Sequence, residues 1–237
     1  MITETIEWHP IILSLEVALA SLVAVFILGI ACAHFISRRE FSGKYVLDAL
    51  FTLPLVLPPV VTGFFLLLLV GKQGPIGMLL TRYFSTQIIF TPVAAVIAST
   101  VVAFPLMYQS SKAAFQSIDA NLEAAARTLG ASETRVFFTI TLPLAWSGLA
   151  AGAVLSFARS MGEFGATIMI AGNIPGQTQT LPLAIYFAAE SNDLITAGIY
   201  VTIICLITFS AILGLSKWSQ TVGGNSRKEF SGAKSFY

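Results

Sequence analysis

The chain has 237 residues, of which 56% are apolar types and only 11% are charged, and its mean hydropathy is +0.82. A soluble domain carries about 25% charged residues, so this composition excludes a disordered protein and argues strongly against a water-soluble globule. Because the charge deficit extends along most of the chain, the sequence predicts one integral membrane domain.

Other residue types point away from several classes of function. The net charge of +1 gives no reason to expect a nucleic-acid partner. Cys32 and Cys205 both lie in apolar runs, where we expect buried free thiols, and His9 and His34 are too far apart to share a metal ion. No Gly-rich phosphate loop and no nucleophile with a base and an orienting acid are present, so we expect no catalytic, cofactor or metal site and no ATP site in this chain.

Five apolar stretches are long enough to cross about 30 Å of hydrocarbon as helices. They are residues 11–36, 49–71, 88–111, 136–158 and 194–216. None alternates as a barrel strand does, and a backbone in lipid must satisfy its own hydrogen bonds. We therefore predict an all-α membrane protein with five transmembrane helices in a single domain over 1–220, followed by a flexible tail over 221–237.

The positions of the basic residues predict the orientation of these spans. Most of the 13 Lys and Arg residues lie in the loop after the first span, the loop after the third span and the tail: Arg38, Arg39, Lys44, Lys112, Arg127, Arg135, Lys217, Arg227, Lys228 and Lys234. The opposite side holds only Lys72 and Arg82. By the positive-inside rule, the amino terminus lies outside and the carboxyl terminus in the cytoplasm.

A sixth uncharged stretch, 164–189, is a poor candidate span because Gly, Pro and Asn residues occupy its middle. We expect a loop with short helical pieces, which is either re-entrant or outside the membrane. The alternative of a sixth crossing would place the basic tail outside and so disagrees with the charge pattern.

Three prolines and one pair of charges lie in or next to the spans, where they are candidates to line or gate a pathway through the membrane. Pro54, Pro58 and Pro59 lie in the second span, where they either set helix packing or mark a moving or pore-lining helix. Arg159 and Glu163 lie four residues apart at the outer end of the fourth span. Arg159 either attracts an anion or forms an interfacial pair with Glu163, and the energetics favour the pair.

A short helix over 119–130 is predicted between the third and fourth spans. Asp119 fits its amino-terminal cap, Gly130 fits the residue after its end, and Glu123 and Arg127 have the spacing of an intrahelical ion pair. A narrow apolar stripe lies on another face and consists of Leu122, Ala125, Ala126 and Leu129. So short a helix needs a surface to bind, unless it is an ordinary helix in a surface loop. Ser132 then caps a second helix that continues into the fourth span.

This segment resembles the coupling motif of ABC importer permeases. Gly130, nine further residues, Ile140, Thr141 and Leu142-Pro143 match the motif in full. The register of Gly130 places Ala124-Ala125-Ala126 at the start of the motif, so Glu123 stands one position before the acidic residue of the pattern. Residues 53–63, 125–130, 157–167 and 173–186 are also similar to the molybdate permease subunits of binding-protein-dependent type I ABC importers.

The resemblance implies a homodimeric permease in the prokaryotic cell membrane, two cytoplasmic ABC ATPase subunits that bind the ATP, and an extracytoplasmic molybdate-binding protein. It implies alternating access driven through a coupling segment that comprises Leu122, Glu123, Ala124, Ala125, Ala126, Arg127, Leu129, Gly130, Ile140, Leu142 and Pro143. The nearer alternative is the same permease type for tungstate or sulfate. The remoter alternative is a secondary carrier or a membrane scaffold without an ATPase, but no convincing internal repeat supports a carrier.

Overall fold

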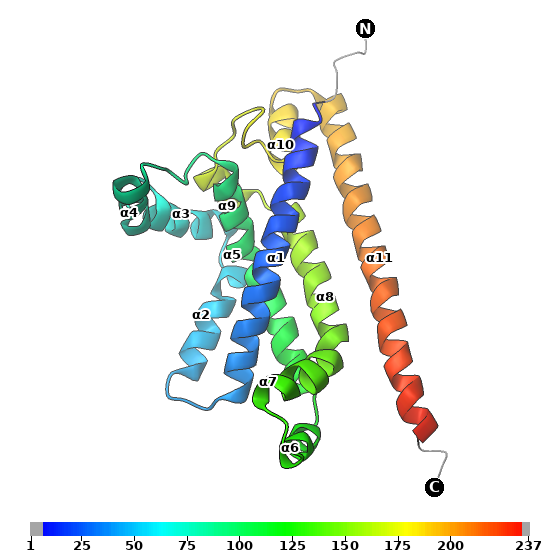
Figure 1. The fold of residues 1–237 in the computed structure, drawn as a ribbon. Coiled ribbons are helices and arrows are strands. Elements are labelled where there is room, and N and C mark those ends of the chain that lie inside the picture. The colour runs from blue at the N-terminus through cyan, green and yellow to red at the C-terminus, as the bar shows by residue number, and fades with distance from the viewer. Residues whose placement is uncertain (1–6, 234–237) are drawn as a thin grey trace.

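The computed structural model describes residues 7–233, with side chains described through residue 214 and at Lys217. Every element in this part of the chain is a helix, which confirms the predicted all-α class (Figure 1). The helices are α1 (His9–Arg38), α2 (Lys44–Val56), α3 (Pro59–Val70), α4 (Pro75–Phe84), α5 (Pro92–Gln116), α6 (Ala120–Thr128), α7 (Glu133–Val136), the π-helix η1 (Phe137–Thr141), α8 (Leu142–Met161), α9 (Gly165–Ile170), α10 (Leu181–Glu190) and α11 (Leu194–Ala233).

Four helical segments are long and apolar enough to cross a membrane, and they coincide with four of the five predicted spans. They are His9–Arg38, Pro92–Gln116, Glu133–Met161 and Leu194–Gly214, of 30, 25, 29 and 21 residues. At a rise of about 1.5 Å per residue, each reaches the thickness of the hydrocarbon core. Figure 1 shows α1 and α11 running the length of the molecule, with the start of α1 and the end of α11 at opposite ends, and α5 and α8 running alongside them over part of it.

The second predicted span consists of two helices with a sharp bend between them. Residues 49–71 form α2 and α3, whose axes are bent by 117°, and only the two helices together count as a span. Leu57 is extended because a following proline disfavours the helical conformation, and Pro58 and Pro59 then start α3 in a new direction. Pro54 lies inside α2. In Figure 1, α3 consequently extends sideways from the bundle instead of continuing along it.

The core of the bundle lies between α1, α5 and α8. Small side chains let these helices approach closely: a Cβ atom at Gly29 of α1 would lie 2.8 Å from Cγ of Met107, and one at Gly152 of α8 would lie 2.7 Å from Cβ of Ser110. Such small-residue contacts are the usual packing of helices in lipid, where no hydrophobic force draws helices together.

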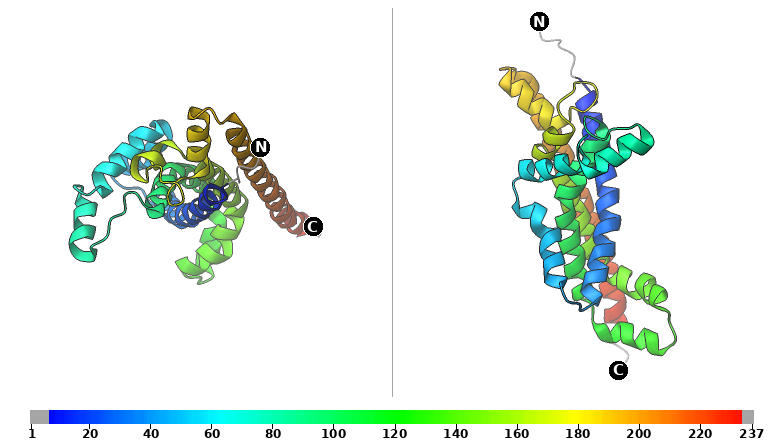
Figure 2. Two further views of the ribbon diagram at one scale, coloured as in Figure 1. Left: turned by 90° about the horizontal axis from the view of Figure 1, so that it is seen from above. Right: turned by 90° about the vertical axis from the view of Figure 1, so that its left-hand side faces the viewer.

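The 164–189 stretch forms α9, a loop and α10, as the loop-and-short-helix prediction expected. Neither helix, of six and ten residues, is long enough to cross the bilayer. Both lie at the same end of the bundle as the start of α1 (Figures 1 and 2). α9 also packs closely against α3. A Cβ atom at Gly63 would lie 2.7 Å from Cα of Ala166, and one at Gly165 would lie 3.0 Å from Cβ of Pro59.

Two expectations concern the outer parts of the fold. Cys32 is half-buried, but Cys205 is exposed, so the prediction of a buried thiol is wrong there; its helix, α11, packs with one side on α8 and α10 and leaves the other uncovered. The expected flexible tail, 221–237, begins within α11 as the structure describes it. Residues 234–237 lie outside the described part, and the flexibility of the tail stays a prediction.

Candidate functional site

The α6 helix forms where the short helix was predicted. Its amino-terminal cap is Asp119, whose side chain accepts a hydrogen bond from the backbone N–H of Asn121 at 2.9 Å. Gly130 follows the end of the helix with φ of +83°, a conformation that glycine adopts without strain. Figures 1 and 2 show α6 and α7 protruding beyond the end of the bundle, on the side opposite α10.

Glu123 anchors α6 to the membrane helices. It is the one residue of α6 that is buried, at 2% exposure. Its carboxylate forms an ion pair with the guanidinium of Arg38, in the last turn of α1, and accepts a hydrogen bond from Thr141 Oγ1 of η1 at 2.6 Å. Arg38 Nη2 also lies 3.3 Å from Thr141 Oγ1. One carboxylate therefore joins three segments that lie far apart in the sequence.

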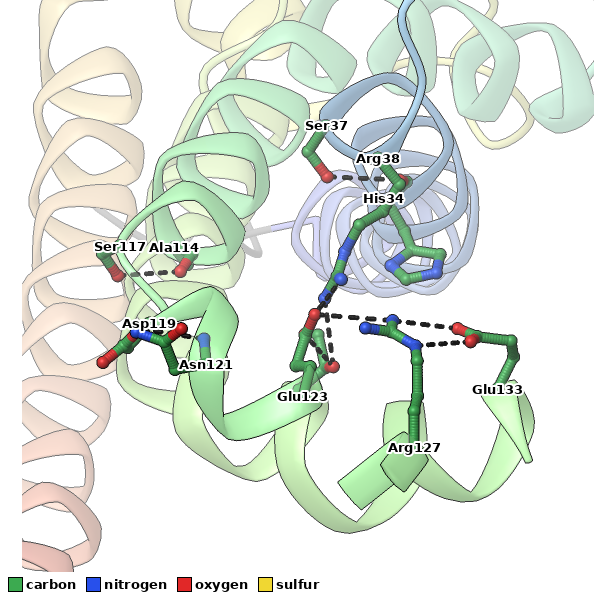
Figure 3. A network of polar contacts seen from close by, with 11 residues as sticks. His34, Ser37, Arg38, Ala114, Ser117, Asp119, Asn121, Glu123, Arg127 and Glu133 are labelled. Carbon is green, nitrogen blue, oxygen red and sulfur yellow. Dashed lines mark hydrogen bonds and ion pairs between the residues drawn. The ribbon is translucent and has the colours of Figure 1, made fainter. Parts of the chain in front are cut away.

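The expected intrahelical pair of Glu123 and Arg127 is present but long, with 3.7 Å between Arg127 Nη2 and Glu123 Oε2. The main partner of Arg127 is instead Glu133 at the start of α7, through bonds of 2.5 Å from Nε and 3.0 Å from Nη2 (Figure 3). This hydrogen bonding raises the pKa of the Arg127 guanidinium. The pair closes the turn between α6 and α7, since the two residues lie on either side of Gly130.

The opposite face of α6 is not covered by the described part of this chain. Leu129 is 88% exposed and Leu122 is 40% exposed. Ala124 and Ala125 are exposed as well, whereas Ala126 is half-buried. The predicted apolar stripe is therefore a surface of small and aliphatic side chains, held at a fixed angle by the buried Glu123 on the other side of the helix.

α7, η1 and α8 form one continuous path from α6 into the membrane. The Ser132 side chain caps α7 by accepting a hydrogen bond from the N–H of Arg135 at 3.4 Å. Pro143 has no N–H to donate to the carbonyl of Thr139. Directly before it, the backbone hydrogen bonds follow the π-helical pattern, in which the N–H of Leu142 bonds to the carbonyl of Phe137, five residues earlier. Ile140 and Leu142 are half-buried, and Pro143 is exposed.

The charged pair at the other end of α8 has the geometry that the sequence favoured. Arg159 Nη1 lies 2.8 Å from Glu163 Oε2, and the Glu163 side chain is only 1% exposed. Its other oxygen, Oε1, accepts a hydrogen bond from the N–H of Ala166 at 2.7 Å and so starts α9. Pro59 packs on Gly165 next to this pair, whereas Pro54 lies apart within α2.

The sequence did not lead to two partners of Glu123 or to one polar cluster between α2 and α5. Arg38 and Thr141 were not selected as site residues, although an arginine directly after a span and a threonine inside the coupling motif are visible signals. Asp48 of α2 also binds Tyr108 Oη at 2.6 Å and Lys112 Nζ at 2.7 Å, which ties α2 to α5. No spacing rule predicts contacts between residues 60 positions apart.

The family model for the inner membrane component of binding-protein-dependent transport systems matches residues 25–218. The chain belongs to this family. It is accordingly a multi-pass inner-membrane permease. It is 50% identical over 200 residues to YvgM of Bacillus subtilis, a putative molybdenum transport system permease protein, covering 84% of this chain and 88% of that one. It is 43% identical over 218 residues to ModB of Escherichia coli K12, a molybdenum transport system permease protein, covering 92% and 95% of the two chains.

Solved structures agree with the fold of this permease. A bacterial alginate ABC transporter in complex with an alginate-bound periplasmic protein contains a chain that superposes with a TM-score of 0.75 at 16% identity, covering 93% of this chain and 80% of that one. At such identity the similarity concerns the fold alone.

Proposed function

We propose that this permease is the membrane-spanning subunit of an ATP-driven importer that moves molybdate into the cell. The observation that carries the proposal is the identity of 43–50% with molybdenum transport permeases over 84–92% of the chain. Molybdate is a tetrahedral dianion, and the chain has little charge in its spans to bind it tightly. A permease must release its cargo, so weak contacts along the path suit transport.

The end of the molecule that carries α6 and α7 faces the cytoplasm. Arg38, Arg39, Lys112, Arg127 and Arg135 all lie at this end, and the positive-inside rule assigns such an end to the cytoplasm. The start of α1 then lies outside, together with α9 and α10. This orientation gives α6 access to a cytoplasmic partner and leaves the 162–193 region for an external one.

The exposed face of α6 binds a cytoplasmic ATPase subunit. Leu129 and Leu122 supply apolar contact area, and the alanines allow close approach. Movement of the ATPase shifts α6, and the Glu123 contacts transmit the shift to Arg38 of α1 and to Thr141 at the start of the fourth span. The spans then alternate between inward-open and outward-open arrangements. The ATPase hydrolyses the ATP, and the permease itself supplies the path.

The assembled importer contains two copies of this permease, two ATPase subunits and an extracytoplasmic molybdate-binding protein. The exposed apolar side chains of α2, none of whose residues is buried, provide surface for a second copy or for lipid. The binding protein docks on the outer end, where α9, α10 and their connecting loop form the surface.

Uptake of radioactive molybdate by cells with and without this chain tests the function. Expression of the permease with its ATPase and binding protein should restore uptake in a transport-deficient strain. Molybdate and tungstate in excess should compete, and sulfate should compete weakly. Uptake of sulfate with no response to molybdate would reject molybdate as the cargo, and uptake that persists without the ATPase would reject the importer class.

A further inference from the structure

A cavity of about 740 Å³ lies between the end of α1 and the α6–η1 segment. Three arginines line it, Arg38, Arg39 and Arg127, and the one acidic residue that lines it is Glu133. Figure 3 shows Arg38 and Arg127 converging from two elements at this place, with the His34 ring beside Arg38. The cavity therefore has a basic wall at the end of the bundle where the chain leaves the membrane.

The charges of this wall do not cancel. Glu123 pairs with Arg38, and Glu133 pairs with Arg127, so two of the three arginines have a carboxylate partner. Arg39 has none among the side chains described, those of residues 7–214 and Lys217; its guanidinium carbon lies 4.6 Å from the centre of the Phe35 ring. Nδ1 of His34 is buried and has no hydrogen-bond partner in the described part of the chain. Because this nitrogen is closed off from solvent, the group left for a ligand is the Arg39 guanidinium.

The other wall of the cavity is apolar and leads toward the membrane. Ala31 and Phe35 line it, and Ile27 lies one turn further along the same face of α1. Phe35 is 43% exposed and Ile27 is 62% exposed. This row of side chains ends at Arg38 and Arg39. A basic site continuous with a lipid-facing apolar strip suits an amphipathic anion better than a free oxyanion, which would have no use for the strip.

We propose that this cavity binds the phosphate headgroup of an anionic phospholipid from the cytoplasmic leaflet, with an acyl chain along Ile27, Ala31 and Phe35. Basic pockets at the cytoplasmic side of membrane helices are suited to such headgroups. Arg39 supplies the uncompensated charge, and Arg127 ties the site to α6. The lipid therefore binds beside the Glu123 anchor and stabilises the position of α6. The inference rests on the proposed orientation, in which this end is cytoplasmic.

The test uses the complete importer, purified and placed in nanodiscs of phosphatidylcholine with increasing phosphatidylglycerol. Native mass spectrometry measures retained phosphatidylglycerol, and ATP hydrolysis measures coupling. Arg39→Gln should lower the affinity for phosphatidylglycerol about fivefold, as expected for the loss of about one basic contact at a membrane surface. Arg39→Lys should restore most of it. Arg135→Gln is the matched control, since Arg135 is exposed at the same end and does not line the cavity.

Equal retention of phosphatidylglycerol by Arg39→Gln and Arg135→Gln would overturn the proposal. Displacement of the lipid by millimolar inorganic phosphate would reassign the site to a free oxyanion. A disulfide between two Phe35→Cys permeases in the assembled importer would show that a second copy covers the strip, which also excludes the lipid. Lipid retention needs no cargo, so failed molybdate transport with intact lipid binding would overturn only the proposed function.

Discussion

The Glu123 carboxylate and the Arg38 guanidinium form an ion pair that joins α6 to the last turn of α1, across 85 positions of sequence. A carboxylate that is only 3% exposed needs such a partner, because an unpaired buried charge is costly. The pair therefore fixes where α6 stands relative to the membrane helices, and the exposed face of α6 owes its position to residues that do not belong to that face.

Arg38→Gln should destabilise the permease by about 3 kcal/mol, at the low end for a broken buried pair, because Arg127 still lies 3.7 Å from Glu123. Thermal unfolding of the purified importer measures this loss. ATP hydrolysis should also become less dependent on the binding protein. The double variant Arg38→Gln with Glu123→Gln should recover part of the stability, because no uncompensated charge remains. A double variant as unstable as the sum of the two single variants would contradict the ion-pair account.

The parts of the fold that could be predicted from sequence are those that depend on local chemistry. Apolar length located α1, α5, α8 and the start of α11, and the Asp119 and Gly130 signals located α6, because these patterns act within a few residues. The 117° bend at Leu57 was only partly predictable. The prolines indicate that the helix bends here. The size of the bend depends on the close packing of Gly63 and Gly165 between α3 and α9.

The exposed face of α6 could be predicted from the sequence, but the contacts of Glu123 that hold α6 in place could not. The stripe through Leu122 and Leu129 follows from helical periodicity. The predicted ion pair of Glu123 with Arg127 followed the same local rule, but the partners depend on burial. Glu123 faces the bundle and binds Arg38 and Thr141, and Arg127 pairs with Glu133 instead. Contacts between distant segments depend on the assembled fold, which spacing does not encode.

Gly130→Val should weaken coupling, because a β-branched residue is strained by about 1–2 kcal/mol at the φ of +83° found here. No atom lies within 4 Å of a Cβ at this position, so backbone conformation is the cause and not crowding. Gly130→Asn is the matched variant, since asparagine tolerates this conformation. Binding-protein-stimulated ATP hydrolysis and molybdate uptake are the measurements. Equal loss in both variants would point to a contact of Gly130 with the ATPase instead.

Leu129→Glu should weaken binding of the ATPase at least about tenfold while leaving the stability of the permease unchanged. Leu129 is 88% exposed, so a charge there meets water in the free subunit and an apolar surface in the complex. Co-purification of the ATPase and thermal unfolding of the isolated permease separate the two effects. Leu129→Met, which keeps an apolar side chain, should retain binding. Full ATPase recovery with Leu129→Glu would exclude this face as the contact.

Arg159→Gln and Glu163→Gln should differ in their effect on stability. Arg159→Gln leaves a carboxylate that is 1% exposed without its basic partner, whereas Glu163→Gln leaves an arginine that is 28% exposed and reaches solvent. We expect the larger fall in unfolding temperature for Arg159→Gln. If Arg159 serves only this pair, the half-saturating molybdate concentration should stay within about twofold of wild type in both variants. A large rise confined to Arg159→Gln would assign the guanidinium to the pathway.

Gly63→Ala should destabilise the permease by about 1–3 kcal/mol, because the added Cβ would lie 2.7 Å from Cα of Ala166 and force α3 away from α9. Gly198→Ala is the control: nothing lies within 4 Å of a Cβ there, in α11, and the change should alter stability by less than about 1 kcal/mol. Thermal unfolding compares the two. Equal unfolding temperatures would mean that α3 and α9 separate without cost.

The π-helix η1 holds one residue more than a regular α-helix would use over the same length, at Phe137–Thr141. A change from π to α register there would rotate α7 about 100° around the axis of α8 and displace it by about 1.5 Å. Thr141 lies within η1 and binds Glu123, so the rotation and the anchor cannot change independently. The extra residue of the fourth span therefore lies at the same point of the helix as its contact with α6.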